Sequence, residues 1–303
     1  MKKFSFSLSL FTMLCLLLGA CKKEARPGAV PANESEEITA KKKPSGTATV
    51  SVLYKGLNNP RGLKFGPDGN LYVAEAGTGG TQSTAGLCPL IQVAPPLGPF
   101  LGSPTSGGVS RITMGGQRTV ITDKLPSSQD ALVPPSIMGP SDVAFLNNSL
   151  YVLIAGAGCS HGVTSMSNGI VRINPNGSTT MIADLGAWLL ANPAKNTAPD
   201  LEPEGVWYSM VTKGNSFYAL EPNQGVLVEV SLDGKIREVA DISATAGHIV
   251  PTALAYKGNF YFGNLGTFPI EPKSSVYKVN PAGKMQTVAT GFSAIVGLVI
   301  DQQ

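Results

Sequence analysis

The chain has 303 residues, of which 35 are glycine and 23 are proline, and only 14% are charged. So many helix-interrupting residues argue against a helical bundle or a coiled coil. A hydrophobic content of 43% with a formal net charge of +3 argues against wholesale disorder. The small charge gives no electrostatic footprint for nucleic acid, so we expect no nucleic-acid partner.

Residues 1–20 have the layout of a secretory signal peptide. A positively charged start precedes the apolar run Phe4–Leu18, which is too short for a comfortable membrane span. The run ends in Leu18–Cys21, which resembles the bacterial lipobox, where the cysteine is diacylated and becomes the new N-terminus. We therefore predict lipidation at Cys21 and attachment to a membrane of the cell envelope through lipid.

The residues after the cysteine predict a tether and a location. Lys22, rather than Asp, follows the cysteine, and by the usual sorting pattern of lipoproteins this favours the outer membrane. Residues 21–46 lack apolar periodicity and include the run Lys41–Lys43, so we predict a flexible tether. The folded domain is then expected over residues 47–303.

A grammar of four strands, here written a-b-c-d, occurs four times in this domain. In each repeat, two alternating apolar segments are joined across a turn of Gly, Asp or Asn, and a second hairpin follows. The first hairpins begin at Asn59, Gly139, Glu202 and Val250, and the second at Gly108, Gly169, Gly225 and Ser275. The repetition predicts an all-β fold, a β-propeller of four-stranded blades. A β-sandwich is the rival interpretation, but it does not explain the repeated order.

The two ends of the domain predict a split, partial fifth blade. Ala48–Tyr54 precedes the first a strand and is interpreted as a lone d strand, while Ala294–Ile300 is interpreted as a fifth a strand. No segment of the sequence is left to form the b and c strands of that blade. We therefore expect a C-terminally truncated propeller with unpaired edges near Val52 and Val299.

The long connections all join strand b to strand c or strand d to the next a strand. They are Gly77–Gly107, Pro126–Gly139, Gly156–Asn168 and Gly186–Glu202. In an antiparallel blade these connections lie on one side, so they should share a face. Long loops on a rigid scaffold usually carry binding, and we expect an unknown protein or small-molecule ligand at this face.

The b strands end in aligned residues that suggest a metal site. Glu75, Ile154, Glu221 and Asn264 occupy these positions, and Asp142 lies at the start of an a strand. Carboxylate and amide oxygens that converge on the channel could hold Ca²⁺, which prefers hard oxygen ligands. Ile154 interrupts the set, and carboxylates at a wet rim without any metal are the alternative interpretation.

Other candidate ligand residues lie between the second and third repeats. Asp200, Glu202 and Glu204 form a spaced acidic cluster that could bind a cation or a basic partner, or could simply be a solvated loop. Trp188, within a cluster of leucines, could cover an apolar ligand or seal the joint between blades.

Histidine and cysteine offer little catalytic machinery. His161 and His248 lie in no metal-binding spacing, no Gly-x-Ser-x-Gly motif is present, and nothing in the sequence orients His161. Cys88 and Cys159 remain as an even pair in an oxidising compartment, which favours a disulfide between two loops. Free thiols in separate loops are the alternative.

Several segments resemble the ScyD/ScyE family of exported bacterial β-propeller proteins, which have NHL-like repeats. They are Gly139–Val143 with Ser149–Val152, Val250–Leu254 leading to Gly263–Pro269, and Ser275–Gly283. The resemblance runs from about Ala48 to the C-terminus. It implies an envelope protein of six-bladed ancestry and brings no catalytic residues. Members usually continue beyond the point where this chain ends, which agrees with truncation.

Together these observations predict a secreted, lipid-anchored binding module that is more a binding protein than an enzyme. One alternative is a calcium-dependent hydrolase or lactonase of the gluconolactonase (SMP-30) type, which would need an intact ring of oxygen ligands. A quinone-cofactor dehydrogenase of propeller form is another, but the sequence places neither its histidine base nor its basic cofactor contacts.

Overall fold

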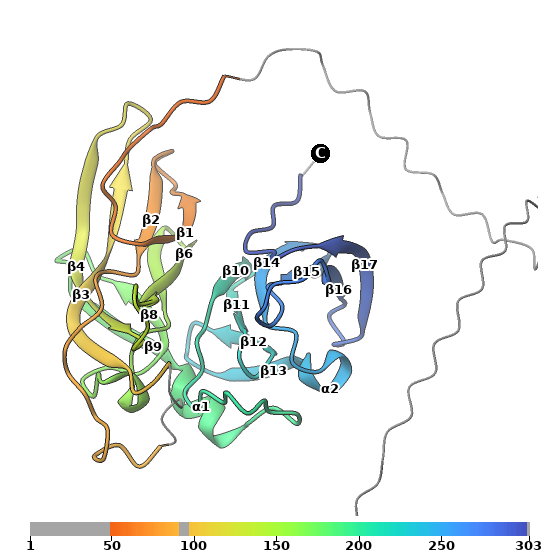
Figure 1. The fold of residues 1–303 in the computed structure, drawn as a ribbon. Coiled ribbons are helices and arrows are strands. Elements are labelled where there is room, and N and C mark those ends of the chain that lie inside the picture. Colours follow the sequence, from red (N-terminus) through yellow and green to blue (C-terminus); the bar gives the residue numbers. More distant parts are fainter. Residues whose placement is uncertain (1–48, 91–96, 302–303) are drawn as a thin grey trace, which may run out of the picture. The chain divides into compact units, whose positions relative to one another are not determined.

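The computed structural model describes residues 49–90 and 97–301 (Figure 1). Contacts divide the chain into two units, Met1–Val50 and Ser51–Gln303. All strands and helices described below belong to the second unit.

Three of the sequence predictions concern other parts of the chain. The signal at 1–20, the lipidated Cys21 and the tether at 21–46 lie outside the described residues. Within the described ranges, no helix is long and apolar enough to cross a membrane.

Four antiparallel sheets follow one another along the chain, and in each the strands lie in sequence order (Figure 1). We call them blades 1 to 4. Blade 1 comprises β1 (Pro60–Phe65), β2 (Leu71–Glu75), β3 (Leu101–Ile112), β4 (Arg118–Gln129) and β5 (Ile137–Met138); blade 2 comprises β6 (Pro140–Leu146), β7 (Ser149–Ile154), β8 (Gly169–Ile173) and β9 (Thr179–Asp184); blade 3 comprises β10 (Ser209–Lys213), β11 (Ser216–Glu221), β12 (Val226–Ser231) and β13 (Ile236–Asp241); blade 4 comprises β14 (Pro251–Lys257), β15 (Asn259–Asn264), β16 (Ser274–Val279) and β17 (Met285–Phe292). The predicted a-b-c-d grammar and the β-propeller fold class are confirmed.

Short helices occupy the connections, namely the 3-10 helix η1 (Cys159–His161), α1 (Leu185–Ala191) and α2 (Ser243–Ala246). No pattern in the sequence predicted these helices. Asp184 caps α1, because its carboxylate accepts the backbone N–H of Ala187 at 2.8 Å.

Tight turns join the a and b strands. In blade 2, Asn147 and Asn148 connect β6 to β7 with φ of 50° and 60°. A two-residue hairpin turn of this hand needs positive φ at both positions, which Asn tolerates better than most residues. The turn sets the register that pairs Leu146 with Ser149 and Val143 with Val152.

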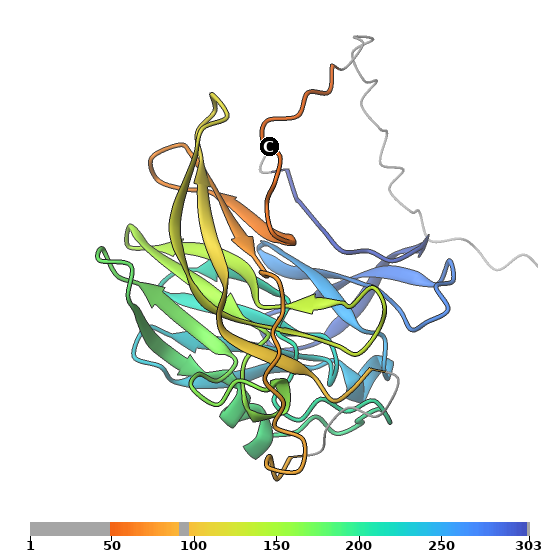
Figure 2. The same ribbon diagram turned by 60° about the vertical axis from the view of Figure 1, so that its left-hand side comes forward.

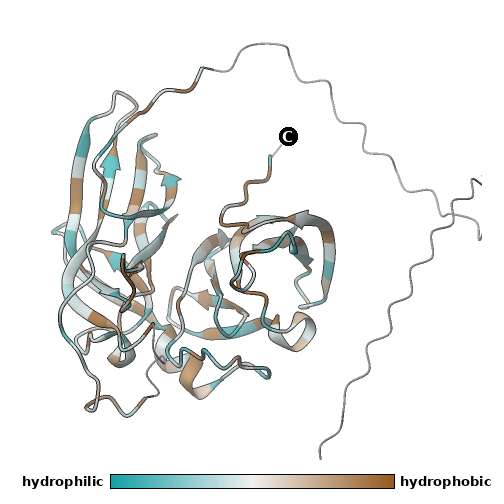
Figure 3. Cartoon of the chain, viewed as in Figure 1, coloured by the Kyte–Doolittle hydropathy of each residue, from teal (hydrophilic) through white to brown (hydrophobic). Residues whose placement is uncertain are grey.

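Apolar side chains from neighbouring blades form the core. Hydrophobic residues recur along the strands (Figure 3), and successive side chains point to opposite faces of a sheet. On β7, Leu153 therefore packs in the core shared with blade 3 and Val152 in the core shared with blade 1. Between blades 2 and 3, Trp207 and Phe217 are fully buried, and the ring of Phe217 lies 4.6 Å from that of Tyr151. Each such buried side chain contributes about 1.5–3 kcal/mol of hydrophobic stabilisation.

The first strand of each blade is adjacent to the first strand of the next. Asp142 on β6 joins three of these strands, because its carboxylate accepts the backbone N–H of Met210 at 2.8 Å and lies 3.4 Å from Lys64 Nζ. Burial raises the pKa of Asp142, and Lys64 opposes that rise.

Blade 1 departs from the predicted boundaries. The sequence analysis placed Gly77–Gly107 and Pro126–Gly139 entirely in loops, whereas β3 and β4 extend into both. Leu101 pairs with Gln129 and Ser103 with Ser127. The long insertion thus returns to the blade and continues its ladder, which residue composition rich in Gly, Pro and Ser does not predict.

The two predicted terminal strands differ from expectation. Residues 49–59 and 293–301 contain no strand in the described structure. A strand requires a hydrogen-bonded neighbour, and the described residues provide none for a full ladder here. Val52 and Val299 are 67% and 92% exposed.

These terminal segments nevertheless lie where a d strand and an a strand of further blades belong. The c–d turn of one blade lies close to the d strand of the preceding blade. A Cβ added to Gly234 in blade 3 would lie 2.5 Å from Ile182 O in blade 2, and a Cβ added to Gly283 in blade 4 would lie 2.5 Å from Val239 O in blade 3. Gly116 in blade 1 makes the same approach to Leu53 O, at 2.8 Å. The segment around Leu53 therefore takes the d position next to blade 1.

At the other end, Ile295 continues the pattern beyond blade 4. Its backbone N–H donates to Asn264 O at 3.1 Å, and its side chain covers Gly263 on β15. Thr252 Oγ1 also donates to Ile295 O. The segment that begins at Ala294 therefore takes the position of the next innermost strand.

The long connections lie on one side of the sheets, as predicted. Figures 1 and 2 both show α1, α2 and the β2–β3 connection at the same end of the blades. Contacts agree, since Phe100 stacks on His161 and His161 Nε2 lies 3.2 Å from Glu202 Oε2. The segments Gly77–Gly107 and Gly186–Glu202 thus meet through the β7–β8 connection. We call this side the long-loop face.

Candidate functional site

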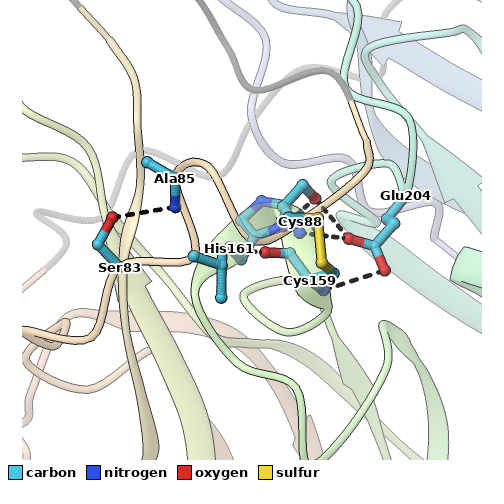
Figure 4. Close-up of a disulfide and its surroundings, with 8 residues drawn as sticks. Ser83, Ala85, Cys88, Cys159, His161 and Glu204 are labelled. Atoms are coloured by element: carbon cyan, nitrogen blue, oxygen red, sulfur yellow. Dashed lines mark hydrogen bonds between the residues drawn. A yellow bond between two sulfur atoms is a disulfide. The ribbon is translucent and has the colours of Figure 1, made fainter.

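A disulfide joins two of the loops on the long-loop face. Cys88 of the β2–β3 connection and Cys159 of η1 have an S–S distance of 2.09 Å and a Cα–Cα distance of 5.6 Å (Figure 4). The hydroxyl of Thr84 donates to Cys159 O, which adds a second link between the same loops.

Glu204 anchors this pair of loops to the connection that follows α1. Its carboxylate accepts the backbone N–H groups of Cys159 at 3.2 Å and Ser160 at 2.7 Å, together with the Ser160 hydroxyl at 2.5 Å (Figure 4). Glu204 is only 6% exposed. A carboxylate held by three donors in this way has a structural role, so Glu204 does not form an open acidic site with its neighbours.

His161 is oriented by the fold, although nothing in the sequence indicated it. The ring is fully buried and stacks on Phe100 at a centroid distance of 4.7 Å and an interplanar angle of 9°. Its Nδ1 lies 3.2 Å from Ser160 Oγ, and its Nε2 lies 3.2 Å from Glu202 Oε2. The Ser–His–Glu arrangement is closed to substrate, because Ser160 and His161 are buried and the serine hydroxyl donates to Glu204.

Glu221 ends β11 as predicted, but its carboxylate is hydrogen-bonded to the backbone of this chain and does not face a channel. Its carboxylate accepts backbone N–H groups of Val206 at 2.9 Å, Asn223 at 3.0 Å and Gln224 at 2.6 Å. Burial raises its pKa to about 7 despite these donors, and the Glu202 carboxylate adds to the rise.

The other proposed calcium ligands are similarly occupied. Glu75 accepts the Asn58 N–H at 2.7 Å and Arg118 Nη2 at 2.8 Å. Asn264 accepts the Ser275 N–H at 2.7 Å. In the part of the chain that the structure describes, no group of three or more His, Cys, Asp or Glu residues is placed to hold a metal. Calcium binding stays a prediction without a site among these residues.

In blades 1, 3 and 4, the residue that ends the b strand instead braces the segment that leads into the a strand, whereas blade 2 has Ile154 at this position. Glu75 holds the backbone of Asn58, Glu221 holds that of Val206, and Asn264 Nδ2 donates to Ile249 O at 2.9 Å. The aligned polar residues that the sequence indicated therefore reflect a repeated structural contact.

The remaining predicted ligands are separate from one another. Asp200 is half exposed, and its carboxylate lies 3.6 Å from His248 Nε2. Trp188 on α1 is partly buried and packs against the core between blades 2 and 3, beside the buried Leu185 and Leu189. Of the two interpretations of Trp188, these contacts favour sealing of the blade joint.

A cavity of about 310 Å³ lies at the long-loop end of the innermost strands, and we call it the mouth cavity. All four blades contribute to it, and its lining is mostly apolar. The lining residues are Arg61, Met138, Gly139, Ser141, Ala155, Glu202, Val206, Trp207, Tyr208, Pro222, Val250, Thr252, Leu265 and Phe268. Of these residues, only Glu202 was predicted from the sequence as a ligand residue, and it was predicted as part of an acidic cluster.

The mouth cavity continues toward the middle of the blades. A second cavity of about 660 Å³ is lined by the innermost strands and shares Arg61, Ser141 and Tyr208 with the mouth cavity. Concave sites with apolar walls and a few polar groups are the usual form of small-molecule sites. No motif could have found this one, because its residues come from segments near the a-strand starts and after the b strands of four blades.

One residue of the cavity wall has a strained backbone. Val250 lines the mouth cavity with φ of 54°, a left-handed conformation that is unfavourable for a β-branched residue. Its carbonyl accepts the Leu265 N–H at 2.8 Å, which holds it in that conformation. Asn59 and Ala294 have similar φ values of 50° and 51°, so a positive φ recurs at residues that lead into an innermost strand.

Comparisons with known proteins give no family. No family model matches the sequence, and no curated protein does either. Solved structures with similar folds include a protein of unknown function from Bacteroides thetaiotaomicron, with 11% identity over 76% of this chain and a TM-score of 0.44. This chain spans only 43% of that protein.

Two further similar structures are named as dehydrogenases. One is a proposed glucose dehydrogenase from Thermus thermophilus, with 15% identity over 82% of this chain and 90% of that one, and a TM-score of 0.45. The other is the PQQ-bound aldose sugar dehydrogenase from Streptomyces coelicolor, with 13% identity over 82% of this chain and 87% of that one, and a TM-score of 0.39. At these identities and TM-scores, the likenesses carry no argument about activity.

Proposed function

We propose that the protein is a cell-envelope lipoprotein of the ScyD/ScyE type whose propeller binds a small ligand in the mouth cavity. The observation that carries this proposal is the cavity itself, which has apolar walls from four blades and lies at the long-loop end of the strands. The alternative ligand is a partner protein that binds the same face. The presence of a cavity favours a small molecule over a protein.

Binding is a better account of this face than hydrolysis. The buried Ser160 and His161 are closed to substrate, and the carboxylates of Glu75 and Glu221 already hold backbone N–H groups. A lactonase of the gluconolactonase type needs oxygen ligands that are free to take a metal. Nothing observed in the described residues favours that alternative.

The binding proposal can be tested with a neutral probe. We would titrate 3-phenylpropan-1-ol into the full mature chain in lipid nanodiscs, with Trp188→Phe as background, so that Trp207 in the cavity wall reports binding. Val206→Phe places a larger side chain in the mouth cavity. Val120→Phe is the matched control, because Val120 lines a different cavity between blades 1 and 2.

We expect a saturable change in Trp207 fluorescence that Val206→Phe removes and Val120→Phe retains. The same response in both variants, or no saturable response in the parent, would contradict binding in the mouth cavity. The lipoprotein part has its own test. Cys21→Ser should shift the protein from the membrane fraction to the soluble fraction, and unchanged membrane association would refute lipidation as the anchor.

A further inference from the structure

The mouth cavity contains a single cationic side chain, and that side chain has no acidic partner among the described residues. Arg61 is the second residue of β1 and the only Lys or Arg in the lining. Its Nη2 donates to Ile137 O, and none of the ion pairs among the described residues includes Arg61. The guanidinium of this exposed residue therefore keeps donors available in a lining that is mostly apolar.

Two hydroxyl groups in the lining of the mouth cavity already donate a hydrogen bond, and a third is available. Ser141 Oγ donates to Leu153 O, and Thr252 Oγ1 donates to Ile295 O. The Tyr208 hydroxyl has no hydrogen-bond partner among the described residues, and Tyr208 lines both the mouth cavity and the larger cavity, as Arg61 does. The Arg61 guanidinium and the Tyr208 hydroxyl are therefore two available donors in the lining that the two cavities share.

The remaining charge in the lining is Glu202, and it limits the ligand's charge. Glu202 is the only carboxylate that lines the mouth cavity within the described residues. Its Oε2 lies 3.2 Å from His161 Nε2, on the side of the buried imidazole ring. A second negative charge on a ligand would be repelled by this carboxylate.

We propose that the mouth cavity binds a monocarboxylate with an apolar body. The carboxylate is held by the Arg61 guanidinium and the Tyr208 hydroxyl, and the body lies against Val206, Trp207 and Leu265. Guanidinium and carboxylate match in a two-pronged hydrogen-bonded geometry, which gives both affinity and orientation. This inference rests on the proposed function, since it names the ligand class for the same cavity.

The test uses four probes that share one body and differ in charge. They are 3-phenylpropanoate, the neutral 3-phenylpropan-1-ol, the dianion benzylmalonate and L-phenylalanine. We would measure the Kd of each by Trp207 fluorescence at pH 7.5, in the Trp188→Phe background. We expect 3-phenylpropanoate to bind about tenfold or more tightly than the alcohol, as a charged hydrogen bond implies. Benzylmalonate should bind more weakly than the monoanion.

Variants separate the charge from the shape of the site. Arg61→Gln should remove the advantage of the acid over the alcohol and leave the Kd of the alcohol unchanged. Arg61→Lys should retain part of that advantage, and it keeps the test valid if Arg61→Gln unfolds, which the melting temperature would reveal. Arg172→Gln, on the exposed surface of β8, is the matched control and should change neither Kd.

Each alternative outcome has a definite meaning. Equal Kd values for acid and alcohol, with both lost in Val206→Phe, would overturn the monocarboxylate inference and leave the binding proposal intact. Tighter binding of L-phenylalanine than of 3-phenylpropanoate would also overturn it, because Glu202 would then be an ammonium site. Absence of binding by every probe would remove both proposals.

Discussion

The buried carboxyl group of Glu221 should make the folded chain less stable as the pH rises from 5 to 8. Burial raises the pKa of Glu221 to about 7 from 4.5. Between those values the folded chain holds a proton that the unfolded chain has lost, so the free energy of unfolding falls with rising pH across this window. At 1.36 kcal/mol per pKa unit, the full loss is about 3 kcal/mol.

The assay is urea unfolding at pH 5, 6, 7 and 8 at constant ionic strength, followed by tryptophan fluorescence. Glu221→Gln mimics the protonated side chain, so its unfolding midpoint should vary much less over this range than that of the parent. Glu238→Gln, at an exposed position of β13, is the matched control and should keep the parent's pH dependence. The reasoning would be refuted if the urea midpoint of the parent stayed level or rose from pH 5 to 8. It would also be refuted if the midpoint of Glu221→Gln fell by as much as that of the parent.

Three further outcomes follow from the same contacts. Cys88→Ser should lower stability by up to about 4 kcal/mol, because the disulfide closes a loop with a sequence separation of 71; equal melting temperatures of the two proteins without reductant would contradict this. Trp207→Phe should cost much less than Trp207→Ala, for which about 3–5 kcal/mol is expected, since the buried Trp207 Nε1 has no hydrogen-bond partner to lose among the described residues. Similar unfolding free energies for the two variants would disprove that account. Adding Ca²⁺ should leave the melting temperature unchanged, because the Glu75 and Glu221 carboxylates hold backbone N–H groups; a calcium-dependent rise that Glu75→Ala abolishes would reverse this conclusion.

The strand grammar was predictable because each blade is built from local contacts. Alternating apolar residues define the strands, and short turns such as Asn147–Asn148 define the hairpins. Both signals lie within a few residues of one another. The position of the long-loop face also followed, since antiparallel pairing places alternate connections on opposite sides.

The sequence was less informative where a residue's role depends on distant partners. Glu75, Glu221 and Asn264 stand out at aligned b-strand ends, and a carboxylate or amide at such a position looks the same whether it binds a metal or a backbone N–H. Only the folded chain shows that Asn58, Val206 and Ile249 are their partners. For the same reason, His161 had no visible orienting group until Phe100 and Glu202 were brought to it.

What the sequence determined by itself is therefore the set of blades, their order and the side that carries the insertions. What only the tertiary structure decided is the mouth cavity and the unpaired charge of Arg61 within it, as the described residues define them. The physical reason is that a blade is specified by neighbours along the chain, whereas a cavity among four blades is specified by residues from separate strand ends and connections of every blade. Those residues share a wall in space and no pattern in sequence.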